Sequence, residues 1–166
     1  NRDFLVSSLR SSHFLKGKTT SDFIDKAKPK RSVILQGKSL EQATIAAALW
    51  IQGRNRNDAT ILQNIPSGWR NSRLPRQKIG FSYLDKEIFV SYKSNRDNSF
   101  SVNEGSTAQI LEWSTRGIDI EIDNSRFFSK VTQNKDSLVV HGPWGDILFK
   151  VLPRFTLPGT EIQAGG

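Results

Sequence analysis

The hydrophobic pattern of this chain changes once, from helical spacing to strict alternation. The stretch from Ala43 to Ile51 contains no charge and one polar side chain, Thr44, and its alanines favour a thin helix. A capping box formed by Ser39 and Gln42 predicts the start of this helix, and Gly53 predicts its end. Because both faces are apolar, we expect a helix covered on all sides and too short to span a bilayer, with an ordinary helix in a layered core as the alternative.

Beyond Lys78 the apolar positions recur every second residue, which predicts strands. Between 118 and 123, three isoleucines alternate with three acidic residues, so this strand has one apolar and one wetted face. Eight strands are expected, over 78–84, 87–94, 99–103, 107–114, 118–123, 126–133, 137–141 and 144–152, joined by short turns. The expected fold is mainly β with a central helix: an eight-stranded antiparallel up-and-down β-barrel wrapped around a buried α-helix, because closure removes the exposed edges and the helix fills the barrel.

The segments on either side of the barrel lack a core of their own. Phe4, Leu5, Ser8, Leu9 and Ser12 lie at helical spacing within 3–15, with Gly17 at the end, and Ser21 predicts the cap of a second short helix with Phe23 and Ile24. We interpret 1–31 as the tail of a preceding domain plus a linker, 32–157 as the barrel domain, and 158–166 as a linker to a following domain. Because the chain has no methionine, we expect it to be a piece of a longer protein.

The loop at 53–77 carries large apolar side chains among arginines, without sustained periodicity. Its apolar residues include Ile61, Leu62, Ile65 and Trp69, and Arg70 follows directly. Apolar and aromatic anchors beside arginine have the composition of a protein-interface hot spot. The loop is therefore predicted to bind a partner, with folding back over one end of the domain as the alternative.

The formal net charge of +8 is confined to two segments. Residues 1–31 hold eight Lys or Arg against three acidic residues, 53–78 hold six against one, and the remainder holds ten against twelve. The two basic segments and Trp69 leave open a single-stranded nucleic-acid-binding barrel as the alternative function. Against it, the aromatic residues Phe81, Tyr83, Phe89 and Tyr92 have no basic stripe beside them.

Residues that could carry chemistry are few. There is no cysteine, and His13 and His141 are far apart, neither with a nearby carboxylate pattern. The acidic residues at 119, 121 and 123 have a spacing like that of metal ligands but no calcium-type glycine loop, so a solvated strand face explains them better. The run 142–145 is read as a turn rather than a phosphate cradle. We therefore predict no active site, metal site or cofactor site in this chain.

Three runs of residues resemble one family. Asp3-Phe4-Leu5 through His13-Phe14 to Phe23-Ile24 is similar to the end of a biotin carboxylase domain. Ile65-Pro66-Ser67-Gly68-Trp69-Arg70-Asn71 resembles the signature after the central helix in the biotin-carrying α subunits of acyl-CoA carboxylases, such as the propionyl-CoA enzyme. Pro158-Gly159 to Gly165-Gly166 lies where that family continues into its biotin carrier domain.

The resemblance implies a non-catalytic interaction domain between biotin carboxylase and biotin carrier domains. In such subunits the loop after the helix is a hook that binds the carboxyltransferase (β) subunit within a large hetero-oligomer, here 53–77 with Ile61, Leu62, Ile65, Trp69 and Arg70 as contacts. Biotin, and ATP with Mg, would belong to the rest of the parent ligase, because the biotin-accepting Met-Lys-Met motif and the ATP-grasp residues are absent from this chain. No membrane partner is implied, and the location would be the bacterial cytoplasm or the mitochondrial matrix.

Overall fold

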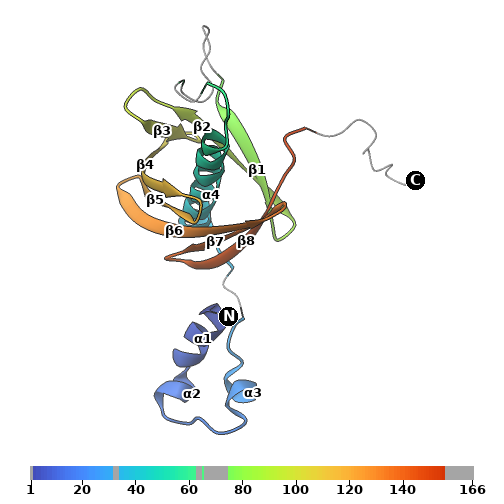
Figure 1. Ribbon diagram of the computed structural model, residues 1–166. Coiled ribbons are helices and arrows are strands. Elements are labelled where there is room, and N and C mark those ends of the chain that lie inside the picture. Colours follow the sequence, from blue (N-terminus) through green and yellow to red (C-terminus); the bar gives the residue numbers. More distant parts are fainter. Residues whose placement is uncertain (1, 32–33, 63–64, 66–74, 156–166) are drawn as a thin grey trace, which may run out of the picture.

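The computed structural model describes residues 2–31, 34–62, 65 and 75–155. Three short helices precede the barrel, α1 (Arg2–Leu9), α2 (Ser12–Leu15) and α3 (Phe23–Ala27), and they form a small unit beyond one end of it (Figure 1). The helix expected over 3–15 is two helices, because the Ser11 hydroxyl accepts from the Phe14 amide and starts α2 anew. The predicted Ser21 cap is wrong, since Asp22 takes the N-cap position of α3.

The central helix is α4 (Gly37–Asn57), and both of its predicted ends are wrong. It begins two residues before Ser39, whose backbone is therefore already helical, and its N-cap Gln36 makes no side-chain capping bond. It also continues through Gly53. An added Cβ at this position would lie 2.4 Å from the Trp113 ring. This glycine allows a close approach of helix and sheet, and it does not end the helix.

Eight strands follow α4 and form a closed antiparallel barrel in chain order (Figure 1). They are β1 (Gln77–Tyr83), β2 (Lys86–Ser94), β3 (Ser99–Val102), β4 (Ser106–Ser114), β5 (Gly117–Ile122), β6 (Ser125–Asn134), β7 (Ser137–Gly142) and β8 (Gly145–Val151). Every bound lies within one residue of the predicted bound. The mainly β class, the eight-stranded barrel and its up-and-down order are thus confirmed.

The core consists of α4 packed in the barrel. All ten residues from Ala43 to Gln52 are buried, and they pack with inward side chains such as Phe81, Ile120 and Phe149. Full burial of one leucine or isoleucine side chain stabilises the fold by roughly 1.5–3 kcal/mol, so this shared core fixes the helix to the sheet. None of the helices in the described ranges is long and apolar enough to cross a bilayer.

Candidate protein-interaction surface

The last turns of α4 are held to β4 by two tryptophans. The Trp50 indole donates to the Ser114 carbonyl at 3.0 Å, and the Trp113 indole donates to the Trp50 carbonyl at 3.0 Å. Their ring centroids are 6.4 Å apart. These two reciprocal bonds, each worth about 1 kcal/mol, fix the position at which the chain leaves the barrel.

Arg54 adds a second attachment on the next turn. Its guanidinium donates to the Gln133 side-chain oxygen of β6, and its Cζ atom lies 5.8 Å from the centroid of the Trp50 ring. The helix then ends at Asn57, and the amide of its C-cap residue Asp58 donates to the Arg54 carbonyl at 2.8 Å. The final turn is therefore tied to β4 and β6, and it forms a fixed base for the residues that follow.

Two large apolar side chains project just beyond this base. Ile61 is 75% exposed and Leu62 is 70% exposed. Leu62 has φ of 56°, and its carbonyl accepts from the Ile65 amide at 3.1 Å, so the chain turns here. Ile65, at 36% exposure, lies next to this turn. The structure thus places three of the five predicted contact residues together at the end of the barrel from which α4 emerges.

The other two predicted contacts, Trp69 and Arg70, lie outside the described residues. The boundary of the hook needs a correction, because 53–57 belongs to α4 and the non-helical segment begins at Asp58. The prediction treated Gly53 as the end of the helix, whereas this glycine packs against Trp113, which is itself bonded to Trp50. Sequence periodicity alone could not show this contact between residues 63 positions apart.

A hollow of about 880 Å³ lies beside the end of α4, and sequence reasoning missed it. Its walls are the last turns of α4 and the β2–β3 loop, with Arg56 and Arg96 among the lining residues. The loop is well held, because the Asn95 side chain bonds the Ser99 and Ser101 hydroxyls at 2.9 and 3.1 Å. The hollow therefore adds polar and basic groups to the candidate surface at the last turns of α4.

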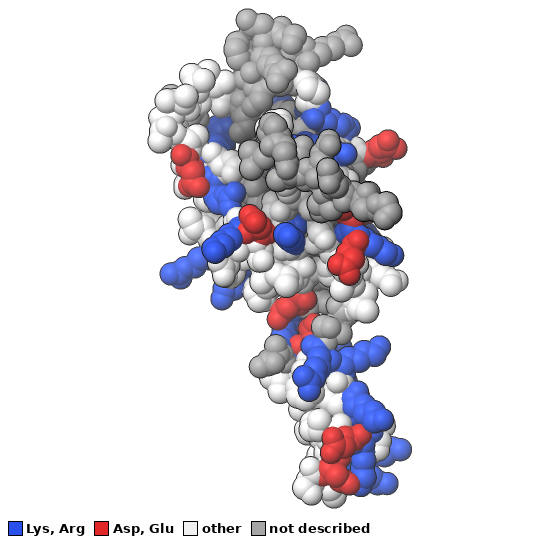
Figure 2. All heavy atoms as spheres, turned by 90° about the vertical axis from the view of Figure 1, so that its right-hand side faces the viewer, with Lys and Arg blue, Asp and Glu red and all other residues white. Residues whose placement is uncertain are grey.

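The charges in this region are mainly positive, with one acid held ionised. A hydrogen bond from the Ser99 hydroxyl, followed by one from its amide, holds the pKa of Asp97 below its ordinary value. Elsewhere, Lys and Arg outnumber Asp and Glu on the N-terminal helical unit, and both signs are also mixed over the barrel (Figure 2).

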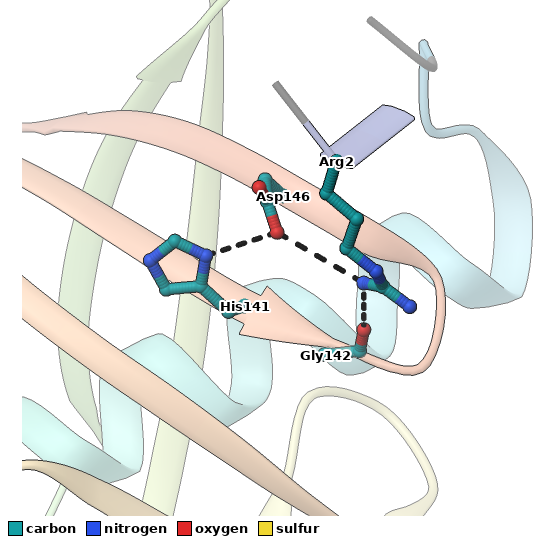
Figure 3. A network of polar contacts seen from close by, with 4 residues as sticks. All are labelled: Arg2, His141, Gly142 and Asp146. Atoms are coloured by element: carbon teal, nitrogen blue, oxygen red, sulfur yellow. Dashed lines mark hydrogen bonds and ion pairs between the residues drawn. The ribbon is translucent and has the colours of Figure 1, made fainter. Parts of the chain in front are cut away.

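The prediction that His141 lacks a nearby carboxylate is wrong. The β7–β8 register places Asp146 opposite His141, and the Nδ1 to Oδ1 distance is 2.9 Å (Figure 3). Arg2 of α1 reaches the same carboxylate at 3.9 Å and donates to the Gly142 carbonyl at 3.0 Å. The Asp146 carboxylate thus joins α1 to the β7–β8 hairpin. This arrangement is a structural junction between the helical unit and the barrel.

One of the alternating acidic residues, Asp119 of β5, pairs with a basic side chain. Arg126 of β6 donates to both carboxylate oxygens of Asp119, at 3.2 and 2.7 Å, and this pairing lowers the pKa of Asp119. Among the residues that the structure describes, no cluster of His, Asp or Glu has the geometry of a metal site.

The aromatic residues that could stack nucleic-acid bases lie largely inside the barrel. Phe81 is fully buried, Tyr92 is 4% exposed, and the Tyr83 hydroxyl accepts from the Leu35 amide at 3.0 Å. Only Phe89 of these four is exposed, at 46%. A platform of successive exposed rings is therefore missing from this part of β1 and β2.

No protein-family model matches this chain, and no curated protein matches it in sequence.

Proposed function

We propose that this chain is the interaction domain of a biotin-dependent acyl-CoA carboxylase α subunit, docking that subunit onto its carboxyltransferase. The observation that carries the proposal is the exposure of Ile61 and Leu62 directly after a helix anchored in a barrel. Exposed apolar anchors on a rigid support are the arrangement from which interface hot spots draw their energy. Trp69 and Arg70 would complete the contact, as the resemblance to the family implies.

In this proposal the barrel surrounds α4 on every side. The burial of the whole stretch from Ala43 to Gln52 supports that enclosure, as do the packing contacts of α4 with β2, β4, β5, β6 and β7. A helix enclosed in this way cannot tilt relative to the barrel without breaking strand pairing. The hook therefore keeps a fixed position relative to the whole domain. The domain would act as a rigid spacer.

The contribution to catalysis would be a high effective concentration. Docking turns the meeting of a biotin carrier with the carboxyltransferase site into an intramolecular event. Biotin, ATP and Mg would act in the other domains of the parent ligase. The exposed side chains of Leu5, Leu9, Phe14 and Leu15 support a further contact, since an apolar face of this kind fits against a preceding biotin carboxylase domain.

The test uses the whole subunit that contains this chain, co-expressed with the carboxyltransferase. We expect Ile61→Asp combined with Leu62→Asp to lower co-purification at least tenfold, because each buries a charge in an apolar contact. ATP-dependent carboxylation of biotin should persist while overall carboxyl transfer falls. The matched control is Leu84→Asp, which is 57% exposed in the β1–β2 turn and should leave assembly intact.

Unchanged assembly of the double variant would refute the hook. Loss of the biotin carboxylation half-reaction with assembly intact would also count against the proposal. Binding of a single-stranded oligonucleotide by the 166-residue chain, weakening steeply as salt is raised, would instead favour the nucleic-acid-binding alternative.

A further inference from the structure

The barrel closes over a short seam. β1 pairs with β2 along its entire length, from Gln77 to Tyr83, but it pairs with β8 only at Phe81 and Ser82. One further bond crosses the seam, from the Leu152 amide to the Gly80 carbonyl at 2.9 Å. The first residues of β1 therefore have a strand on one side only among the described residues.

The backbone of Lys78 faces the open side. Backbone groups of a strand alternate between its two edges, so Lys78 points the same way as Gly80, toward the seam. The partner strand gives an independent check. Ser91, directly opposite Lys78, accepts from the Asn103 amide at 2.7 Å and donates to the Asn103 side chain at 3.1 Å, and so it faces β3. The Lys78 N–H and carbonyl thus lie on an unpaired edge within the described part of the chain.

A groove of about 550 Å³ runs along this edge, between β1 and the chain that leaves β8. Ile51, Ile79, Phe89 and Leu152 give it apolar walls. The Phe89 ring occupies the space beside Gly80, where an added Cβ would lie 2.8 Å from it. A strand laid along Lys78 would therefore place alternate side chains against an apolar surface.

The rim of the groove is basic. Arg76, Lys78 and Arg154 line it, and the lining contains no Asp or Glu. The Lys78 ammonium lies 3.9 Å from the Phe89 ring centroid, and the Arg76 guanidinium donates to the Asn103 carbonyl. None of the three cations forms an ion pair with a described carboxylate. Such cations repel a second copy of the same edge and favour an acidic strand.

We propose that this open stretch of β1 binds an extended acidic peptide segment of a partner protein by strand addition. The peptide backbone pairs with Lys78, alternate apolar side chains enter the groove, and the carboxylates between them face the basic rim. This inference stands independently of the proposed docking, because the groove is lined by none of the five predicted contacts Ile61, Leu62, Ile65, Trp69 and Arg70.

The test measures fluorescence anisotropy of a dye-labelled, acetylated nine-residue peptide of alternating Val and Glu with the 166-residue chain. Lys78→Pro removes the outward N–H without touching the β1–β2 ladder, whereas Lys78→Gln removes only the charge. We expect Lys78→Gln to weaken binding a few-fold and Lys78→Pro to weaken it at least tenfold, with both variants keeping the unfolding midpoint of the parent chain.

Modified peptides keep the test decisive even if Lys78→Pro fails to fold. N-methylation of alternate amides removes strand pairing at constant charge, and Lys in place of Glu reverses the charge. Both should abolish binding. Equal binding of the N-methylated peptide, or of the Lys peptide, overturns the proposal. So does concentration-dependent self-association of the chain at this edge, which would make a second copy the occupant.

Discussion

Gly53→Ala sets two physical effects of opposite sign against each other in the last turns of α4. Helix propensity favours alanine over glycine by about 1 kcal/mol in a helix interior. The structure opposes the change, because the new Cβ would lie 2.4 Å from the Trp113 Cδ1 and Nε1 atoms. Overpacking of this kind costs roughly 1–3 kcal/mol, and displacing Trp113 also loses its bond to the Trp50 carbonyl, worth about 1 kcal/mol. We expect a net loss of about 1–3 kcal/mol.

The assay is urea unfolding followed by far-ultraviolet circular dichroism, in a double-mutant cycle with Trp113→Ala. With the ring removed, the clash disappears and Gly53→Ala should stabilise the chain by about 1 kcal/mol. The sign of the substitution thus reverses between the two backgrounds. Stabilisation by Gly53→Ala in the parent chain would refute the argument that close approach explains this glycine.

Two further perturbations test the interior of the barrel. Burial raises the pKa of Tyr92 to about 12, so the stability that its neutral hydroxyl contributes is complete below about pH 10 and is lost as pH rises toward 12. We expect the urea midpoint of Tyr92→Phe to fall less than that of the parent chain between these pH values. An unchanged pH profile would contradict this. Ala47 is fully buried on α4, so Ala47→Leu should overpack the core and lower the free energy of unfolding by roughly 1–3 kcal/mol. An unchanged urea midpoint would show that the core can accommodate a larger side chain at this position.

Local patterns were enough to predict the strands and much of the helix. Period-two alternation and turn residues predicted all eight strands within one residue, because strand formation and hairpin turns depend on neighbouring residues. The apolar run after Ala43 predicted a buried helix for the same reason. The candidate surface was predicted only in part: Ile61, Leu62 and Ile65 were identified by composition, whereas the hollow lined by Arg56 and Arg96 had no local signal.

The amino-acid sequence by itself determined the order of elements, the antiparallel connections and the basic, apolar character of the segment after α4. Only the tertiary structure shows that Gly53 lies inside α4 against Trp113 of β4, because these two residues are far apart in the chain. It likewise decided the pairing of Asp146 with His141 and Arg2, and the length of the β1–β8 seam. These features depend on strand register and barrel closure, which join residues far apart in the chain.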